Sequence, residues 1–203
     1  MDILIRPEEE KDFKNAECTI REAFWDLYRP GCVEHLIAHN MRKSPDFVKE
    51  LDYVACDGDT VAGNIIYSRA KVINDENNEF EALCMGPLAV LPSYQRKGIG
   101  SLLMNCSIEK ARQLGYKAIF IFGNPEYYKR FGFRNTREYN IQTPSGEYFD
   151  AFMALELYSG SLKQVSGKFL ASGSFEVTEE EVEKFEEEFP HKTKHITDTQ
   201  LFH

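Results

Sequence analysis

Apolar and polar residues are arranged along the first half of the chain in a pattern that predicts a short strand, two helices and a hairpin. Residues 3–7 form an apolar run typical of a strand, and residues 8–26 place apolar side chains at helical spacing. A Pro-Gly pair ends this pattern, and a second helix is predicted over residues 33–41. Two β-rich runs within residues 51–73 flank an Asp-Gly-Asp turn, which indicates a hairpin.

The middle of the chain alternates strands with helices. Residues 80–92 predict a strand in which Gly86-Pro87 should interrupt the ladder, because proline lacks an N–H and glycine favours a bulge. A helical pattern follows over residues 99–114 and should end at the next glycine. The nearly all-apolar residues 117–122 predict a central strand that is buried on both faces.

A short helix and one more strand complete the predicted fold. Asn124 is suited to cap a helix from Pro125 to about Phe131, and residues 149–157 predict a strand. Strands and helices in this order indicate an α/β (α+β) fold, with a mixed β-sheet and helices on both faces. We expect residues 1–158 to form this domain.

A C-terminal extension over residues 159–203 follows the predicted domain. It is rich in glycine and serine, and it contains a helical stretch at residues 178–189. Thr178 and Glu181 form a capping-box pattern, and the glutamates that follow are typical of a solvated helix face rather than a metal site. The extension is expected to pack on the domain or on a second subunit, in a monomer or a homodimer.

Length, composition and charge narrow the function classes. The length of 203 residues suits one domain. The sequence shows neither the basic start of a signal peptide nor an apolar run long enough for a membrane span, and this favours a cytoplasmic protein. The five cysteines are scattered without a CxxC pair, so we expect reduced thiols and no metal site. The net charge of −9 argues against a nucleic-acid partner and favours cationic ligands.

The segment QRKGIG, residues 95–100, combines two glycines with two cations between a strand and a helix. A helix start carries unpaired N–H groups and partial positive charge, and glycine lets an anion approach them. The segment therefore indicates a phosphate or pyrophosphate site, and an exposed turn without a ligand fits these six residues equally well. A dinucleotide GxGxxG motif is excluded because Leu103 replaces its last glycine, and a P-loop is excluded because its GK[ST] end is missing.

The surrounding residues carry a more specific signal. The runs LAVLPSYQRKGIGSLLM and YYKRFGF resemble the GNAT superfamily of acetyl-CoA-dependent N-acetyltransferases, in particular a bacterial branch of predicted N-acetyltransferases. The family signature [Q/R]xxGx[G/A] matches Gln95 to Gly100, and its tyrosine four residues before a Gly-Phe pair matches Tyr128. The resemblance covers residues 3–157 in element order and implies an acyl-CoA N-acyltransferase fold with a centrally splayed sheet.

The resemblance implies acetyl-CoA, or coenzyme A after transfer, as the co-substrate. The pyrophosphate is expected on the amides of the turn, and the pantetheine arm beside the backbone of a bulged strand. The cofactor-binding residues implied in this way are Leu88, Ala89, Val90, Gln95, Arg96, Lys97, Gly98, Ile99, Gly100, Ser101, Asn124 and Arg130.

The resemblance also implies that an amine attacks the thioester carbonyl directly. A backbone N–H near Leu88 is expected to stabilise the tetrahedral oxyanion, and Tyr128 is expected to protonate the leaving thiolate. Lys129 or Arg130 could lower the pKa of Tyr128 or hold cofactor phosphates, while Tyr127 is expected to pack.

The general base stays open. Some family members carry a glutamate on the bulged strand, and Cys84 occupies that position here, where a buried structural thiol is expected. Glu81, Glu34 and His35 are alternative bases acting through water, and a water chain without a dedicated base is a further alternative.

The acceptor is expected to be a cationic small-molecule or peptide amine bordered by residues 25–32. His35 and His39 have the spacing of a metal pair, but no carboxylate completes the motif, so surface histidines are expected. The missing glutamate at Cys84 keeps a second function open, a non-catalytic module that binds or senses acyl-CoA. An unrelated phosphate-binding α/β domain is a third alternative.

Overall fold

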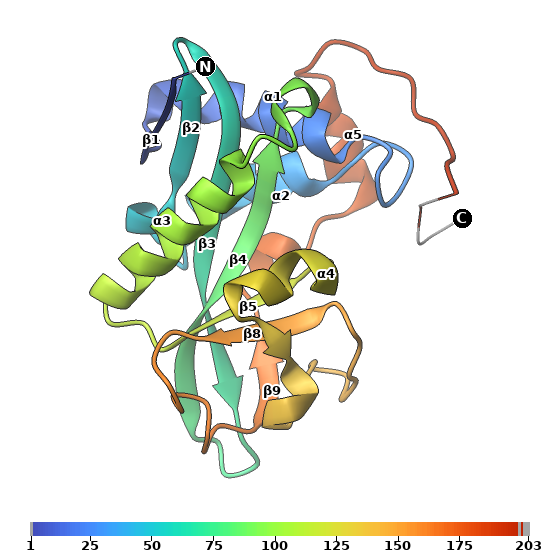
Figure 1. The fold of residues 1–203 in the computed structure, drawn as a ribbon. Coiled ribbons are helices and arrows are strands. Elements are labelled where there is room, and N and C mark those ends of the chain that lie inside the picture. Colours follow the sequence, from blue (N-terminus) through green and yellow to red (C-terminus); the bar gives the residue numbers. More distant parts are fainter. Residues whose placement is uncertain (1, 199, 201–203) are drawn as a thin grey trace.

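The structure is a computed structural model that describes residues 2–198 and 200. A nine-stranded sheet forms its centre (Figure 1). Its strands are β1 (Ile3–Pro7), β2 (Tyr53–Asp57), β3 (Thr60–Ile73), β4 (Glu79–Val90), β5 (Ala118–Phe122), β6 (Arg134–Asn135), β7 (Ile141–Gln142), β8 (Phe152–Glu156) and β9 (Gly167–Leu170). The main path runs β1-β2-β3-β4-β5-β8-β6, while β9 pairs with β3 and β7. The pairs β4–β5 and β7–β9 are parallel, and the other pairs are antiparallel.

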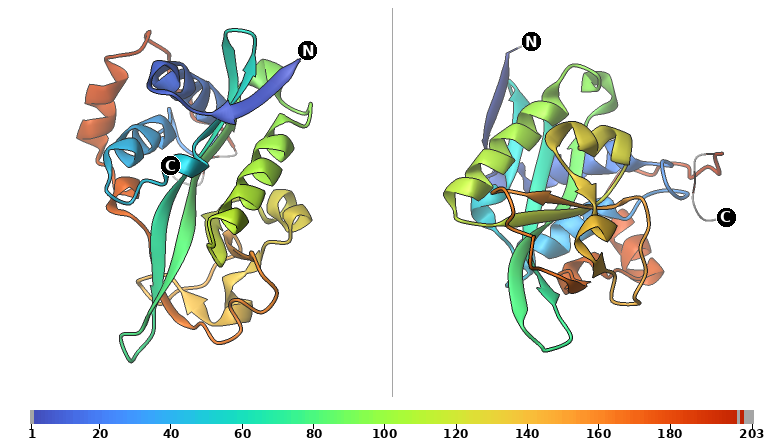
Figure 2. Two further views of the ribbon diagram at one scale, coloured as in Figure 1. Left: turned by 90° about the vertical axis from the view of Figure 1, so that its left-hand side faces the viewer. Right: turned by 60° about the horizontal axis from the view of Figure 1, so that its bottom comes forward.

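Helices cover both faces of the sheet, as predicted. They are α1 (Phe13–Phe24), α2 (Glu34–Lys43), α3 (Ile99–Gln113), α4 (Pro125–Tyr128) and α5 (Glu179–Glu186). Helices α3 and α4 lie on one face, and α1, α2 and α5 lie on the other (Figure 2). Leu103 of α3 packs with Leu83 on the first face, and Ile20 of α1 packs with Ile66 on the second. Among the described residues, none of the helices combines the length and the apolar character that a bilayer crossing needs.

Most predicted elements are observed, with differences at their ends. The register between β3 and β4 shifts opposite Gly86-Pro87, as predicted. The strand predicted from residue 149 begins at Phe152, because residues 149–152 form a turn in which the Phe152 N–H donates to Phe149 O at 3.1 Å. β6 and β7 were not predicted, since two residues carry no periodic signal.

The C-terminal extension contributes a strand and a helix to this architecture. β9 adds to the edge of β3 at Lys71–Ile73. α5 begins with the predicted capping box, and its Val182 and Phe185 side chains pack with Leu36 of α2. Residues 199 and 201–203 of the expected extension lie outside the described residues.

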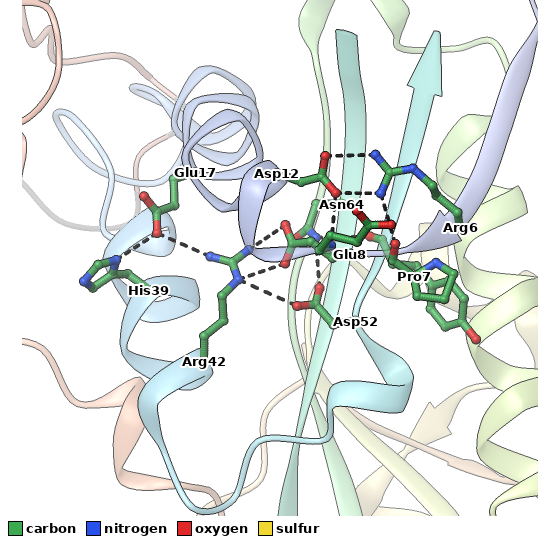
Figure 3. Close-up of polar contacts among 11 residues, drawn as sticks. Arg6, Pro7, Glu8, Asp12, Glu17, His39, Arg42, Asp52 and Asn64 are labelled. Carbon is green, nitrogen blue, oxygen red and sulfur yellow. Dashed lines mark hydrogen bonds and ion pairs between the residues drawn. The ribbon is translucent and has the colours of Figure 1, made fainter. Parts of the chain in front are cut away.

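A buried polar network joins α1 and α2 to the first strands (Figure 3). The Arg42 side chain is 4% exposed and donates two hydrogen bonds to the Glu8 carboxyl, at 2.8 and 3.0 Å. The same guanidinium lies 3.4 Å from Glu17 and 3.6 Å from Asp52. Burial, and next the hydrogen bond with Asp52, raise the pKa of Glu8 to about 10. The Glu8 carboxyl is therefore protonated at neutral pH.

Replacing Glu8 with glutamine is expected to remove a loss of stability at alkaline pH. The pKa of Glu8 rises from its usual 4.5 to about 10 on folding, so between these values the folded chain holds a proton that the unfolded chain has released. The free energy of unfolding of the wild-type protein should fall as pH rises through this window, by at most about 1.4 kcal/mol per pH unit.

Urea unfolding at about pH 6 and about pH 9 tests the protonation of Glu8 in the folded protein. Glutamine has no proton to release, so the Glu8→Gln variant should lose less stability than the wild-type protein between the two conditions. Parallel losses in the two proteins would contradict the raised pKa of Glu8.

Candidate active site between β4 and β5

β4 and β5 part in the middle of the sheet. Their pairing is confined to Leu83 with Ile119 and Cys84 with Phe120. The bulge at Gly86-Pro87 follows directly, and a bulge bends the strand that carries it. The predicted central splay is therefore confirmed. It leaves an opening between the second half of β4 and the end of β5.

One backbone edge of β4 faces this opening. The Leu91 N–H donates to Ala62 O at 2.9 Å, so Leu91 directs its polar groups toward β3. Because this direction alternates along an antiparallel strand, Leu88 and Val90 direct theirs toward the opening. The Gln95 side chain donates to Val90 O at 3.0 Å, which agrees with this direction. The edge can therefore pair with an extended ligand that carries amide groups.

Helix α3 starts beside this edge with uncapped amides. Gly98 stands at the N-cap with φ +86°, and no side chain within the described residues caps the helix. The first helical bond runs from the Leu102 N–H to Gly98 O at 3.0 Å. The N–H groups of Ile99, Gly100 and Ser101 thus precede the helical ladder. With the helix dipole, they form a site suited to an anion.

The loop before α3 adds positive charge to this site. Arg96 and Lys97 are both exposed, and Arg96 adopts a positive φ of +60°. Lys97 Nζ donates to Ser93 O at 2.8 Å, which holds its ammonium group near the loop. These cations act locally, because the protein as a whole is acidic and salt screens charges beyond about 8–10 Å.

Tyr127 reaches the start of α3 from α4. A Cβ atom on Gly100 would lie 2.6 Å from Tyr127 Oη, so this close approach requires glycine. The Arg130 guanidinium lies over the Tyr127 ring, 4.0 Å from its centroid, which brings Arg130 near the same site. The Asn124 side chain serves the helix cap instead, because it accepts from the Glu126 N–H at 2.9 Å, as predicted.

Tyr128 is half-buried on α4 and packs against the end of β5. Its ring fills the space where Gly123 would otherwise carry a Cβ atom. Burial raises the pKa of the Tyr128 phenol, and the electrostatic effects of Tyr127, Tyr67 and Tyr28 raise it further. The phenol is therefore protonated at neutral pH and available as a proton donor.

The two cations beside Tyr128 in the sequence do not lower its pKa. Lys129 pairs with Glu126 at 3.2 Å, and Arg130 lies over Tyr127. The expectation that one of them depresses the pKa of Tyr128 is wrong, because burial prevails.

Cys84 and Glu81 have different surroundings. Cys84 is fully buried in an apolar cluster, and this burial raises the pKa of its thiol. Glu81 is exposed and lines a groove of about 460 Å³ together with Arg69. The pKa of Tyr116, which follows the C-terminal end of α3, is raised by burial and next by the charge of Glu81. Glu81 is therefore not brought together with Tyr128.

His35 is not the surface residue that was expected. Its side chain is 0% exposed and lies between the rings of Phe185 and Phe189, each 5.2 Å away between centroids. His35 Nδ1 lies 3.4 Å from Cys32 Sγ, and Nε2 lies 2.8 Å from Glu186 Oε1. Burial lowers the pKa of His35 to about 4, so the imidazole is neutral and closed off from an incoming amine.

The two histidines of α2 bind different partners. His39 Nδ1 contacts Glu17 Oε1 at 2.8 Å, whereas His35 faces Glu186. The Arg21 guanidinium hydrogen-bonds both oxygens of Glu186, at 2.8–3.1 Å. The Glu186 carboxylate, which a metal ion bound at His35 would need as a ligand, is therefore already paired with a positive charge.

The predicted acceptor segment, residues 25–32, connects α1 to α2. Tyr28 in this segment is 40% exposed, and its ring lies 6.2 Å from that of Phe24, which packs against the apolar cluster that contains Ala89 of β4. The pKa of Tyr28 is raised by burial and next by the charge of Glu34, which follows the segment. Trp25 faces the C-terminal residues instead, because its Nε1–H donates to Thr193 O at 3.1 Å.

Comparison with known proteins decides the family. The profile of the Acetyltransferase (GNAT) family matches residues 19–133, more than half of the chain. This chain belongs to the GNAT family. The matched range begins in α1 and includes the bulged strand, the start of α3 and Tyr128.

Two GNAT relatives from Escherichia coli K12 are similar in sequence. The uncharacterized N-acetyltransferase YhbS is 26% identical over 166 residues, which are 81% of this chain and 93% of YhbS. The uncharacterized N-acetyltransferase YjhQ is 35% identical over 71 residues, which are 35% of this chain and 39% of YjhQ. This chain therefore aligns with nearly all of YhbS and with well under half of YjhQ.

Solved GNAT structures share the fold. The crystal structure of Escherichia coli YhbS in complex with CoA matches with a TM-score of 0.76 at 25% identity, over 85% of this chain and 91% of that chain. A GNAT acetyltransferase from Brucella melitensis in complex with acetyl-CoA matches with a TM-score of 0.69 at 22% identity, over 86% of this chain and 99% of that one. The expected GNAT fold and bacterial N-acetyltransferase relatives are both confirmed.

Sequence reasoning missed Tyr67, which shares an apolar cluster with Tyr128. Tyr67 is fully buried in β3, where its hydroxyl lies 2.8 Å from Ser107 Oγ. After burial and Tyr127, it contributes to the raised pKa of Tyr128. An apolar strand pattern accounts for Tyr67 without any function, so no local signal could have distinguished it.

Proposed function

We propose that this protein transfers the acetyl group of acetyl-CoA to a primary amine. The observation that carries the proposal is the opening between β4 and β5, which joins an outward backbone edge, an uncapped helix start and a protonated phenol. The alternative of a different phosphate-bearing ligand would use the helix start but would leave the edge and the phenol without a role.

The chain offers acetyl-CoA three kinds of contact. The N–H groups of residues 98–101, with Arg96 and Lys97 beside them, suit the pyrophosphate. The outward N–H and C=O groups of Leu88 and Val90 suit the amides of the pantetheine arm. Crystal structures of the relatives YhbS and the Brucella acetyltransferase contain CoA and acetyl-CoA, which supports this choice of co-substrate.

The transfer we propose is a direct attack in one site. The amine nitrogen bonds to the thioester carbonyl carbon, and the resulting oxyanion accepts a hydrogen bond from a backbone N–H near Leu88. The C–S bond then breaks, and the sulfur takes the phenolic proton of Tyr128. The second proton of the attacking nitrogen leaves as the amide forms and returns through water to the phenolate. A thiol has a pKa of about 8.5 and a free phenol about 10, so this proton transfer is uphill by about 2 kcal/mol before burial adds to it. The transfer must therefore coincide with C–S cleavage.

The attacking amine must first lose a proton. An alkylamine with a pKa of about 10.4 pays nearly 5 kcal/mol for this at pH 7. Glu34 is the proposed proton acceptor, through water, because it closely follows the acceptor segment, whereas His35 is fully buried and Glu81 lines a groove together with Arg69. A cationic acceptor agrees with the net charge of −9.

Release of free thiol tests the proposed reaction. The protein is mixed with acetyl-CoA and a panel that contains spermidine, an aminoglycoside and a lysine peptide, and thiol release is compared with protein-free and amine-free blanks. We expect at least one amine to accelerate release, and calorimetry should show preference for CoA over ATP and NAD. Tight CoA binding with no turnover would favour the non-catalytic acyl-CoA module, for which the buried Cys84 thiol is the supporting observation.

A further inference from the structure

The C-terminal segment, defined as residues 178–198, runs along the acceptor segment between α1 and α2. Figure 1 shows the two segments side by side, and the second view in Figure 2 agrees. Direct contacts join them at Trp25, Arg29 and Gly31, among other positions. Trp25 Nε1–H donates to Thr193 O at 3.1 Å, and Arg29 pairs with Glu179. The Lys194 side chain lies about 3.1 Å from the position that a Cβ atom on Gly31 would take.

Arg21 anchors this contact from the end of α1. Its buried guanidinium hydrogen-bonds Glu186 at 2.8–3.1 Å and Pro190 O at 3.1 Å. It also lies over the Trp25 ring, 4.3 Å from the centroid. One side chain therefore holds α5, the chain after it and the first residue of the acceptor segment.

Asp26 is a second anchor within the acceptor segment. Its carboxylate accepts from the Gly31 N–H at 2.7 Å and contacts His195 Nδ1 at 2.9 Å. Its backbone carbonyl accepts from Thr197 Oγ1 and Gln200 Nε2, at 3.3 and 3.2 Å. Burial alone would raise the pKa of Asp26, but the bonds from Gly31 and His195 bring it below its usual value. The carboxylate is therefore charged and fully engaged at neutral pH.

The acceptor segment also reaches the second half of β4. Tyr28 is 40% exposed and packs 6.2 Å from the Phe24 ring between centroids, and Phe24 packs against the apolar cluster that contains Ala89 of β4. Contacts that fix one face of the acceptor segment also set the positions of the side chains on its other face. A displacement of about 1 Å in such a site can reduce turnover about 10²-fold.

We propose that the C-terminal segment positions the acceptor segment for the amine, with Asp26 and Trp25 as the positioning residues. The inference rests on the proposed acetyl transfer and adds to it that the amine side of the site depends on residues 178–198. The acetyl-CoA side does not depend on them, because the anchors contact neither the edge of β4 nor the start of α3.

Two variants and a matched control test this separation. Asp26→Gly removes the carboxylate and suits the positive φ of +58° at this position, so it adds no backbone strain. Trp25→Phe removes the bond to Thr193 and keeps an aromatic ring. Lys14→Ala is the control, because Lys14 also pairs with the C-terminal part of the chain, at Glu188 (3.0 Å), but lies at the start of α1.

The measurements are the KM for the fastest amine of the panel, the Kd for acetyl-CoA and hydrogen exchange of residues 25–33. We expect Asp26→Gly to raise the amine KM by about 10-fold or more and to speed exchange of the Gly31 amide. Trp25→Phe should raise the amine KM by about 3-fold, while all three variants keep the acetyl-CoA Kd within about 2-fold of wild type. Lys14→Ala should leave the amine KM unchanged.

An unchanged amine KM in Asp26→Gly and Trp25→Phe, with normal wild-type turnover, overturns this inference alone. An equal loss of acetyl-CoA affinity also overturns it, because the segment would then have a general structural role. If Asp26→Gly fails to fold by circular dichroism, Trp25→Phe against Lys14→Ala decides the question. A wild-type protein that turns over no amine overturns the proposed function and this inference with it.

Discussion

Replacing Tyr128 with phenylalanine is expected to lower kcat for acetyl transfer by about 10²- to 10⁴-fold, the range measured when general-acid catalysts are removed. The ring still fills the space beside Gly123, so packing on the end of β5 is kept. The acetyl-CoA Kd should change by less than about 2-fold, because the amides of α3 and the edge of β4 are untouched. Stopped-flow thiol release and calorimetry measure the two quantities.

The matched control for this experiment is Tyr139→Phe. Tyr139 is half-buried against the apolar cluster that contains Cys84, and its replacement should leave kcat unchanged. Because burial raises the pKa of Tyr128 above its usual 10.0, the rate should also not fall between about pH 7 and about pH 9.5 through loss of the phenolic proton. A Tyr128→Phe variant with wild-type kcat would remove the phenol from the mechanism.

Replacing Arg42 with methionine is expected to cost about 3–5 kcal/mol of stability, the range measured when one partner of a buried ion pair is removed. Methionine keeps an apolar stem against the Phe13 ring, over which the guanidinium lies at 4.7 Å. It leaves the buried carboxyls of Glu8, Glu17 and Asp52 without their cation.

Urea unfolding followed by circular dichroism measures this cost, and Arg134→Met is the control. The Arg134 side chain is 66% exposed and lies 3.7 Å from Glu138, so its loss should change stability by less than about 0.5 kcal/mol. Equal small effects of both substitutions would show that the carboxyl cluster does not need Arg42.

Much of the fold could be predicted because its signals are local. Gly86-Pro87 predicts a bulge from the missing N–H of proline alone, and residues 117–122 predict a buried strand from composition alone. The helix start at Gly98 and the cap at Asn124 follow from residue chemistry in the same way. Each of these features is decided within a few residues, so no tertiary contact was needed to find it.

Other features could not be predicted because they depend on distant partners. Glu8 belongs to a run of glutamates that suggests a solvated surface, yet Arg42 of α2 holds it in the interior. His35 is buried because α5 packs over it from the other end of the chain. The raised pKa of Tyr128 depends first on burial, which its own neighbours in the sequence do not reveal.

The pairing of β9 with β3 has a consequence for synthesis of the protein. Lys71–Ile73 pair with residues 168–170, so this edge of β3 stays unpaired until most of the chain has been synthesised. An uncovered strand edge is a template for pairing between molecules. Truncated or stalled chains that end before β9 should therefore self-associate, and the nascent protein should depend on chaperones until its last strand emerges.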